Sequence, residues 1–182
     1  CREFRDRRGE AQALGTMGNV HLSRRKYAMA MALYKKSIAI SQEIGDRRGE
    51  RQTSGNMAIV HNTQGRHNEA IAMYKDILAV SEELGDRHGK GTTLSNMGEV
   101  RRMQKRYDEA MELYNDSLKI KREIGDRRGE GQALSNMGLL MAETGEVAKA
   151  KGYWQEALQA LEGMGVPEEE MVKEWWAMLE DG

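Results

Sequence analysis

The sequence predicts an all-α protein made of stacked pairs of helices. The strongest indication is the hexapeptide Gly-Asp-Arg-Arg-Gly-Glu, which occurs at 45–50 and again unchanged at 125–130. Related copies at 5–10 and 85–90 complete a series with a period of 40 residues. Between the copies, apolar residues recur at spacings of three and four, as they do on one face of an amphipathic helix. A fixed period of this length is typical of an array in which each unit packs on the next.

The hexapeptide has the composition of a helix end followed directly by a helix start. Its glycine can take the left-handed conformation that closes many helices, because it lacks a Cβ atom. The aspartate that follows can accept hydrogen bonds from the free amides of the next first turn. These residues are Gly45, Gly85 and Gly125, with Asp6, Asp46, Asp86 and Asp126. The arginines after them are expected to be solvated or to reach back toward Glu43, Glu83 or Glu123 at the end of the preceding helix, and contact with a partner protein is the alternative.

The first helix of each unit is predicted to carry a core face and, beside it, a column of small residues. Spacings of three and four place the core residues on one side of the helix. They are Leu14, Met17, Val20 and His21, then Ser54, Met57, Val60 and His61, then Leu94, Met97, Val100 and Arg101, then Leu134, Met137, Leu140 and Met141. The small residues predict a close approach by another helix, and they are Gly18, Ala58, Gly98 and Gly138.

The second helix of each unit alternates small and large residues on its inner face. Its columns are Ala30, Ala70, Ala110 and Ala150, then Tyr34, Tyr74, Tyr114 and Trp154, then Ile38, Leu78, Leu118 and Leu158. Such a face can interdigitate with the first helix of its own unit and with that of the next unit.

These patterns divide the chain into a helical array at 1–166 and a terminal helix at 167–182. The four repeats span about 7–45, 47–85, 87–125 and 127–165. Residues 1–4 are in register with 41–44, which predicts the end of an earlier helix and hence a piece of a longer array. Pro167 suits the first position of a helix, and the glutamates at 168–170 suit its positive end. We expect this segment to cap the last unit, with Trp175 and Trp176 packed in the cap rather than contacting a ligand.

Two of the units carry a helix-turn-helix signature of small and large residues. It comprises Ser135-Asn136-Met137-Gly138 with Gly145, Ala150, Trp154 and Ala157, and Ser95-Asn96-Met97-Gly98 with Tyr107, Ala110 and Tyr114. In these columns nearly the whole chain resembles the tetratricopeptide repeat family. The period of 40 residues is longer than the usual one of about 34 and is most similar to the Pins and LGN polarity adaptors, with kinesin light chains and bacterial regulatory proteins as more distant relatives. The sequence departs from the pattern at Thr16, Ser54 and His67.

The resemblance implies a right-handed superhelix of about four repeats whose first helices line a concave groove. The asparagines that matter most in that groove are Asn56, Asn96 and Asn136. A carboxamide can both donate hydrogen bonds to the main chain of an extended peptide and accept them from it. The alternative is that each asparagine bonds a neighbouring helix. Charged residues nearby would supply selectivity for the side chains of the peptide. The candidate groove residues are Asn19, Asn56, Asn62, Ser95, Asn96, Glu99, Arg102, Ser135, Asn136 and Glu143.

Composition argues against several functional classes. The net charge of −1 provides no basic field for nucleic acid, and no apolar run is long enough to span a membrane. The single cysteine fits a cytoplasmic location. His21 and His61 recur in a core column without cysteine or acidic neighbours, so we expect buried, hydrogen-bonded histidines rather than a metal site. The segment 85–92 has the wrong spacing for a phosphate loop, and no catalytic constellation is present. We therefore expect no enzymatic activity, no cofactor and no metal.

The leading hypothesis is an adaptor or scaffold that binds an extended peptide segment of a partner protein in the groove. The alternative is a domain that regulates an enzyme on the same longer chain, through its convex face or its arginine turns. Open ends of the array would also permit self-association.

Overall fold

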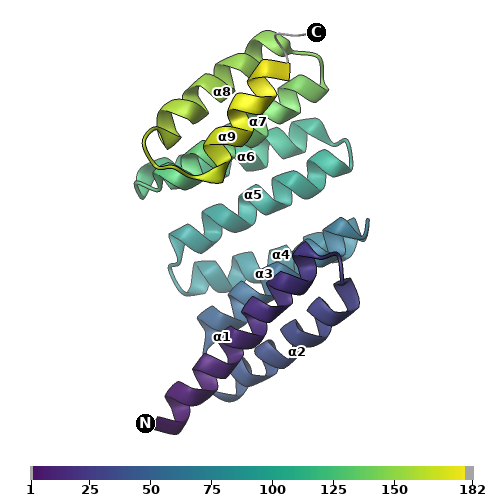
Figure 1. Ribbon diagram of the computed structural model, residues 1–182, viewed down its shortest axis with the longest axis vertical. Helices are drawn as coiled ribbons and strands as arrows, with labels where there is room; N and C mark the ends of the chain where they lie inside the picture. Colours follow the sequence, from purple (N-terminus) through teal and green to yellow (C-terminus); the bar gives the residue numbers. More distant parts are fainter. Residues whose placement is uncertain (1, 179–182) are drawn as a thin grey trace. The chain divides into compact units, whose positions relative to one another are not determined.

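The computed structural model describes residues 2–178 and the side chains of residues 6–178, and the secondary structure in this range is helical. The helices are α1 (Arg2–Ser23), α2 (Tyr27–Glu43), α3 (Arg47–Thr63), α4 (His67–Glu83), α5 (Arg87–Met103), α6 (Tyr107–Glu123), α7 (Arg127–Glu143), α8 (Val147–Leu161) and α9 (Pro167–Met178). They form two compact units, Cys1–Glu83 with α1 to α4 and Leu84–Gly182 with α5 to α9, which we call unit 1 and unit 2 (Figure 1).

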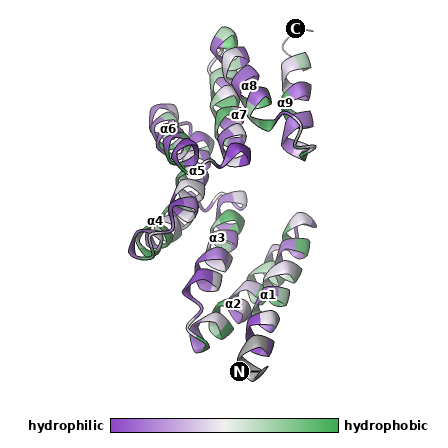
Figure 2. Cartoon of the chain, turned by 90° about the vertical axis from the view of Figure 1, so that its left-hand side faces the viewer, coloured by the Kyte–Doolittle hydropathy of each residue, from purple (hydrophilic) through white to green (hydrophobic). Residues whose placement is uncertain are grey.

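Within each unit, consecutive helices pack as antiparallel pairs, and the pairs stack. In unit 1, α1 packs on α2, α3 on α4, and α2 on α3. In unit 2, α5 packs on α6, α7 on α8, α6 on α7, and α8 on α9. First helices of successive pairs also touch, as α1 and α3 do in unit 1 and α5 and α7 in unit 2. Both hydrophobic and hydrophilic residues occur in the helices of the two units, as expected of helices that bury one face (Figure 2).

The predicted turn chemistry is confirmed at three of the four hexapeptides. The side chain of Asp46 accepts a hydrogen bond from the amide of Gly49 at 3.0 Å, and Asp126 accepts one from Gly129 at 2.9 Å. Asp86 caps α5 in the same way. The glycines before the caps lie in the left-handed region, with φ of 69° at Gly45, 61° at Gly85 and 71° at Gly125.

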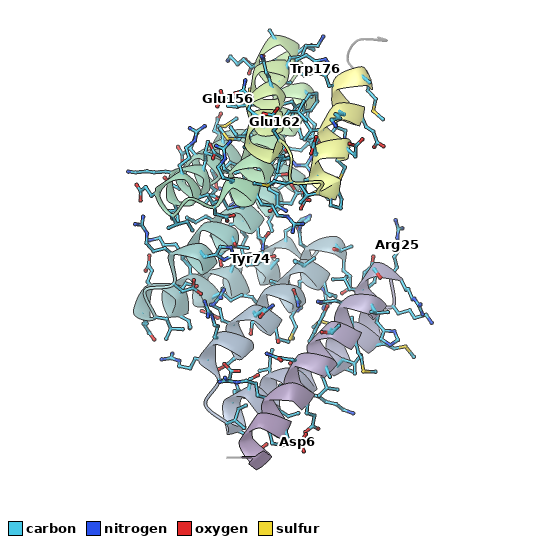
Figure 3. The ribbon with its side chains drawn as sticks, turned by 60° about the vertical axis from the view of Figure 1, so that its left-hand side comes forward. Asp6, Arg25, Tyr74, Glu156, Glu162 and Trp176 are labelled. Atoms are coloured by element: carbon cyan, nitrogen blue, oxygen red, sulfur yellow. The ribbon has the colours of Figure 1, made fainter. Side chains whose placement is uncertain are left out.

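The first hexapeptide behaves differently from the prediction. Helix α1 runs without interruption from Arg2 to Ser23, so no earlier helix ends before Asp6 and this aspartate is not an N-cap (Figure 3). The difference follows from one residue: Arg5 stands where the other copies have glycine. Without a residue that readily adopts positive φ, the chain has no reason to leave the right-handed helix.

The predicted core of the second helices is confirmed. The alanine and aromatic columns are buried throughout, and they are Ala30, Ala70, Ala110 and Ala150 with Tyr34, Tyr74, Tyr114 and Trp154. The last column is only partly correct, because Leu118 is buried whereas the other three members are half-buried. The serines Ser37 and Ser117 are buried as well, and they were not predicted.

The small-residue column is where the aromatic ring of the second helix approaches the first helix. A Cβ atom at Gly98 would lie 2.6 Å from the Tyr114 ring, and one at Gly138 would lie 2.3 Å from Nε1 of Trp154. Such distances are far inside van der Waals contact, so these glycines are required by packing. In the second repeat the column holds Ala58, which is fully buried.

Repeats 1 and 2 depart from the predicted first-helix core. Met17 and Val20 of α1 are 52% and 46% exposed, because no described helix pair packs against the outer side of α1. In α3, Ser54 replaces the leucine of the other repeats and lines an open pocket of about 280 Å³ together with Met73 and Ile77 of α4. At Ser54 the first-helix core column therefore faces an open pocket between α3 and α4.

The terminal helix α9 covers the outer side of the last pair. It packs on α8 and also touches α7 (Figure 1). Val172 has no exposed surface, and the ring of Trp175 lies 5.8 Å from that of Trp154. Leu179, which was also expected on this apolar face, lies outside the described residues.

Candidate functional site

Unit 1 contains a polar pocket of about 500 Å³ between its first helices α1 and α3. Two of the candidate groove residues, Asn19 and Asn56, line it. The Tyr34 hydroxyl donates a hydrogen bond to Oδ1 of Asn19 at 2.7 Å, and this bond restrains the carboxamide of Asn19. Asn62 lies outside the pocket, and its Oδ1 is 2.8 Å from Nδ1 of His67. Unit 1 thus places one held and one free carboxamide in a hollow.

Unit 2 contains an equivalent pocket of about 430 Å³ between α5 and α7, with α9 as a further wall. Asn96 and Asn136 line it, together with Ser95 and Ser135. Both serines are buried, and Ser135 Oγ donates to the carbonyl of Gly131 at 2.7 Å. The serines therefore form the floor, whereas the two asparagines are half-exposed.

The carboxamides of Asn56, Asn96 and Asn136 share one property. In the described part of the chain, none of them makes a hydrogen bond to another residue. Each offers one acceptor and two donor hydrogens to whatever enters its pocket.

The sequence was compared with models of known protein families. Models of the tetratricopeptide repeat match residues 11–44, 50–123 and 90–163. The chain belongs to the tetratricopeptide repeat family. No curated protein matches the sequence.

Solved tetratricopeptide-like structures share the fold at low identity. Aspartyl phosphate phosphatase F from Bacillus subtilis aligns with a TM-score of 0.80 at 17% identity, over 92% of this chain and 45% of that one. A Rap protein complexed with competence and sporulation factor aligns with a TM-score of 0.77 at 15% identity, over 85% of this chain and 43% of that one. BtubC from P. vanneervenii aligns with a TM-score of 0.75 at 17% identity, over 91% and 70%. The chain spans less than half the length of the first two.

The charged residues that were predicted to line the groove, Glu99, Arg102 and Glu143, form hydrogen bonds with one another. Arg102 donates from Nε to Glu99 at 2.9 Å and from Nη2 to the other oxygen of Glu99 at 2.6 Å, and it also bonds Glu143. The Tyr114 hydroxyl donates to Glu99 at 3.1 Å. The hydrogen bonds with Glu99 raise the pKa of Arg102, and burial raises that of Tyr114, so both stay protonated. The cluster carries one excess negative charge.

The turn arginines do pair with these glutamates, but not by reaching back to the preceding helix as predicted: each pairs with the glutamate at the end of its own repeat. Arg47 Nη2 lies 3.0 Å from Glu83, and Arg87 bonds Glu123 in the same way. Each partner is 36 residues ahead of its arginine, at the end of the second helix of the same repeat. In the fourth repeat Gly163 takes the place of the glutamate, and Arg127 donates to the carbonyl of Gln159 at 2.9 Å. The pairs therefore join the two ends of one repeat.

Sequence reasoning missed Lys121, a buried cation at the edge of the unit 2 pocket. Its residue surface is 3% exposed, and Nζ donates to the carbonyl of Gly129 at 3.1 Å. Burial lowers the pKa of this lysine. A signal was present, because the same column holds Ser41, Ser81 and Leu161 in the other repeats.

His21 and His61 differ from the expectation in their hydrogen bonding. His21 and His61 each have a buried Nδ1 without a hydrogen-bond partner, so the expectation of hydrogen-bonded histidines is wrong for these atoms. Burial lowers the pKa of His61. Among the described residues, no group of three or more potential metal ligands occurs. None of the described helices is long and apolar enough to cross a membrane.

Proposed function

We propose that this chain is a protein-interaction module that holds an extended segment of a partner protein in the pockets between the first helices of its repeats. The observation that carries the proposal is the free carboxamides of Asn56, Asn96 and Asn136. A carboxamide can accept from a peptide N–H and donate to a peptide C=O, so it can bind a main chain whatever the side chains are. The module acts by binding, without catalysis, in a cytoplasmic setting.

The volumes of the two pockets support this function. At about 500 and 430 Å³, they fall in the range typical of ligand sites. The structurally similar Rap protein complexed with competence and sporulation factor adds support by analogy, because a fold of this kind is known with a bound factor.

A regulatory role through the arginine turns has less support. Arg47 and Arg87 are engaged with Glu83 and Glu123, so a partner would first have to displace these ion pairs. The free carboxamides need no such displacement.

The test uses a displayed library of random peptides as the probe. Peptides selected on the wild-type chain are synthesised, and their affinities are measured by calorimetry for the wild type and for Asn96→Ala with Asn136→Ala. Losing hydrogen bonds at both positions should weaken binding about tenfold or more, because each contributes about 1 kcal/mol. Asn115→Ala is the matched control, since Asn115 is an exposed asparagine on α6 outside the pocket. Equal affinity of the double variant and the wild type would refute the proposal.

A further inference from the structure

We propose that helix α9 is a wall of the unit 2 binding site and that Met171 and Trp175 bind a large apolar side chain of the partner segment. The inference rests on the proposed function, because the segment is the one held by Asn96 and Asn136. It assigns to α9 a role in recognition in addition to capping.

Helix α9 lines the same pocket as the two asparagines. Pro167, Glu168, Met171 and Trp175 all line the same hollow as Asn96 and Asn136. A main chain bound to the carboxamides would therefore direct one of its side chains toward α9.

The wall is held in place at both of its ends. At the start of α9, Glu168 Oε1 accepts from Arg128 Nη2 at 2.7 Å and from Gln132 Nε2 at 2.6 Å. Further along, Val172 is fully buried and Trp175 packs on Trp154. An anchored wall loses little conformational freedom on binding, which favours affinity.

The surface that α9 offers to the pocket is apolar. Met171 is 42% exposed although it lies between anchored residues, and Trp175 is half-buried. A methionine and an indole together suit a large aliphatic or aromatic side chain, because the thioether adapts its shape and the ring supplies flat apolar area. The two charged groups on the pocket, Lys121 and Glu168, have opposite signs, so neither an acidic nor a basic side chain is favoured by net charge.

The corresponding pocket of unit 1 has no such wall. Several of its lining residues lie 80 residues before an equivalent residue of the unit 2 pocket. Examples are Gln52, which corresponds to Gln132, and Asn56, which corresponds to Asn136. Its remaining lining includes Arg8 and no residue of a helix like α9. The apolar preference is therefore a property of unit 2.

The variants Met171→Ala and Trp175→Ala test the proposal on the peptides selected above. Each should weaken binding about tenfold, and replacing the apolar peptide residue by alanine should weaken binding to the wild type by the same factor. In Met171→Ala, that peptide change should have a smaller effect, because the two changes remove one contact. Met171→Ala keeps the Trp175–Trp154 packing, so it remains informative if Trp175→Ala loosens α9.

Two matched controls lie on the same helix. Met178 is 70% exposed and does not line the pocket, and Trp176 lies over α8 with Lys151 Nζ 5.6 Å from its ring (Figure 3). Met178→Ala and Trp176→Ala should bind the peptides within about twofold of the wild type.

The outcomes separate this inference from the proposed function. If Asn96→Ala with Asn136→Ala loses binding while Met171→Ala and Trp175→Ala keep it, the groove stands and the role of α9 is refuted. Selection of lysine or arginine at the sensitive position would also refute it, because the indole would then act through cation–π attraction. If the asparagine variant binds normally, the proposed function fails, and this inference fails with it.

Discussion

Replacing Gly138 by alanine should destabilise unit 2, because α7 passes the ring of Trp154 more closely than a methyl group allows. The added Cβ atom would lie 2.3 Å from Nε1 and 2.4 Å from Cδ1 of Trp154. Non-bonded carbon contacts are normally about 3.5 to 4.0 Å, so the indole would have to move by more than about 1 Å. Trp154 is 2% exposed, so there is no open space for it to enter.

The size of the effect follows from three contributions. Alanine is favoured over glycine inside a helix by about 1 kcal/mol. Overpacking of a dense core costs about 1 to 3 kcal/mol. A shifted indole also weakens the hydrogen bond from Nε1 to the carbonyl of Ser135, which is 3.1 Å long and contributes about 1 kcal/mol. The free energy of unfolding should therefore fall by about 1 to 3 kcal/mol.

Urea unfolding followed by tryptophan fluorescence measures this in unit 2 alone. All three tryptophans, Trp154, Trp175 and Trp176, belong to that unit. The matched control is Gly152→Ala, because Gly152 lies in helix α8 and nothing would touch a Cβ atom built there within 4 Å. This control should stabilise unit 2 by up to about 1 kcal/mol.

The difference between the two alanine variants isolates the steric contact. It should be about 2 to 4 kcal/mol, since helix propensity contributes equally to both. If Gly138→Ala were as stable as Gly152→Ala, the close approach would not be a constraint, and the small-residue column would need another explanation.

Three further substitutions test individual residues. Lys105 has φ of 59° at the position where the next repeat has Gly145 with φ of 81°. Glycine adopts positive φ without strain, so Lys105→Gly should raise the free energy of unfolding of unit 2, measured in urea, by about 0.5 to 1 kcal/mol, and a decrease would contradict this. The lowered pKa of Lys121 means that the neutral amine is favoured more in the folded state than in the unfolded state. Wild-type stability should therefore rise as pH approaches the ordinary value of 10.5, and Lys121→Met should remove that rise in urea midpoints taken across this range. The pKa of His61 is lowered as well, so the contribution of this histidine to stability should be fully present above pH 6.5 and should be lost as the pH falls below that value. A His61→Met variant followed by circular dichroism should lack this part of the acid dependence.

The parts of the fold that depend on neighbouring residues were predictable from the sequence. Gly45 and Asp46 end one helix and begin another because of their own backbone and side-chain chemistry. The alanine and aromatic columns repeat four times, so they identify the buried face of the second helices. Where one residue of the local signal is absent, as at Arg5, the prediction fails and the helix continues.

The parts that depend on distant residues were harder to predict. Arg47 was expected to be solvated or to reach back toward Glu43, but it pairs with Glu83, which the second helix of the repeat brings close 36 residues later. The exposure of Met17 depends on what packs against α1, and its own sequence position looks like core. Helical periodicity shows on which face of its helix a residue lies, but it does not show which other helix packs against that face.

In the candidate site, too, the residues of the repeats could be predicted, whereas the residues of α9 could not. Asn96 and Asn136 could be identified because they recur in one column beside the core face. Trp175 lies outside the repeat, so no column predicted that α9 would return to the pocket that these asparagines line. Under the proposed function, the repeated asparagines bind the main chain of the partner segment, which every peptide shares. Selectivity for side chains would then come from residues that break the repeat, and in unit 2 we propose that these are Met171 and Trp175 of α9.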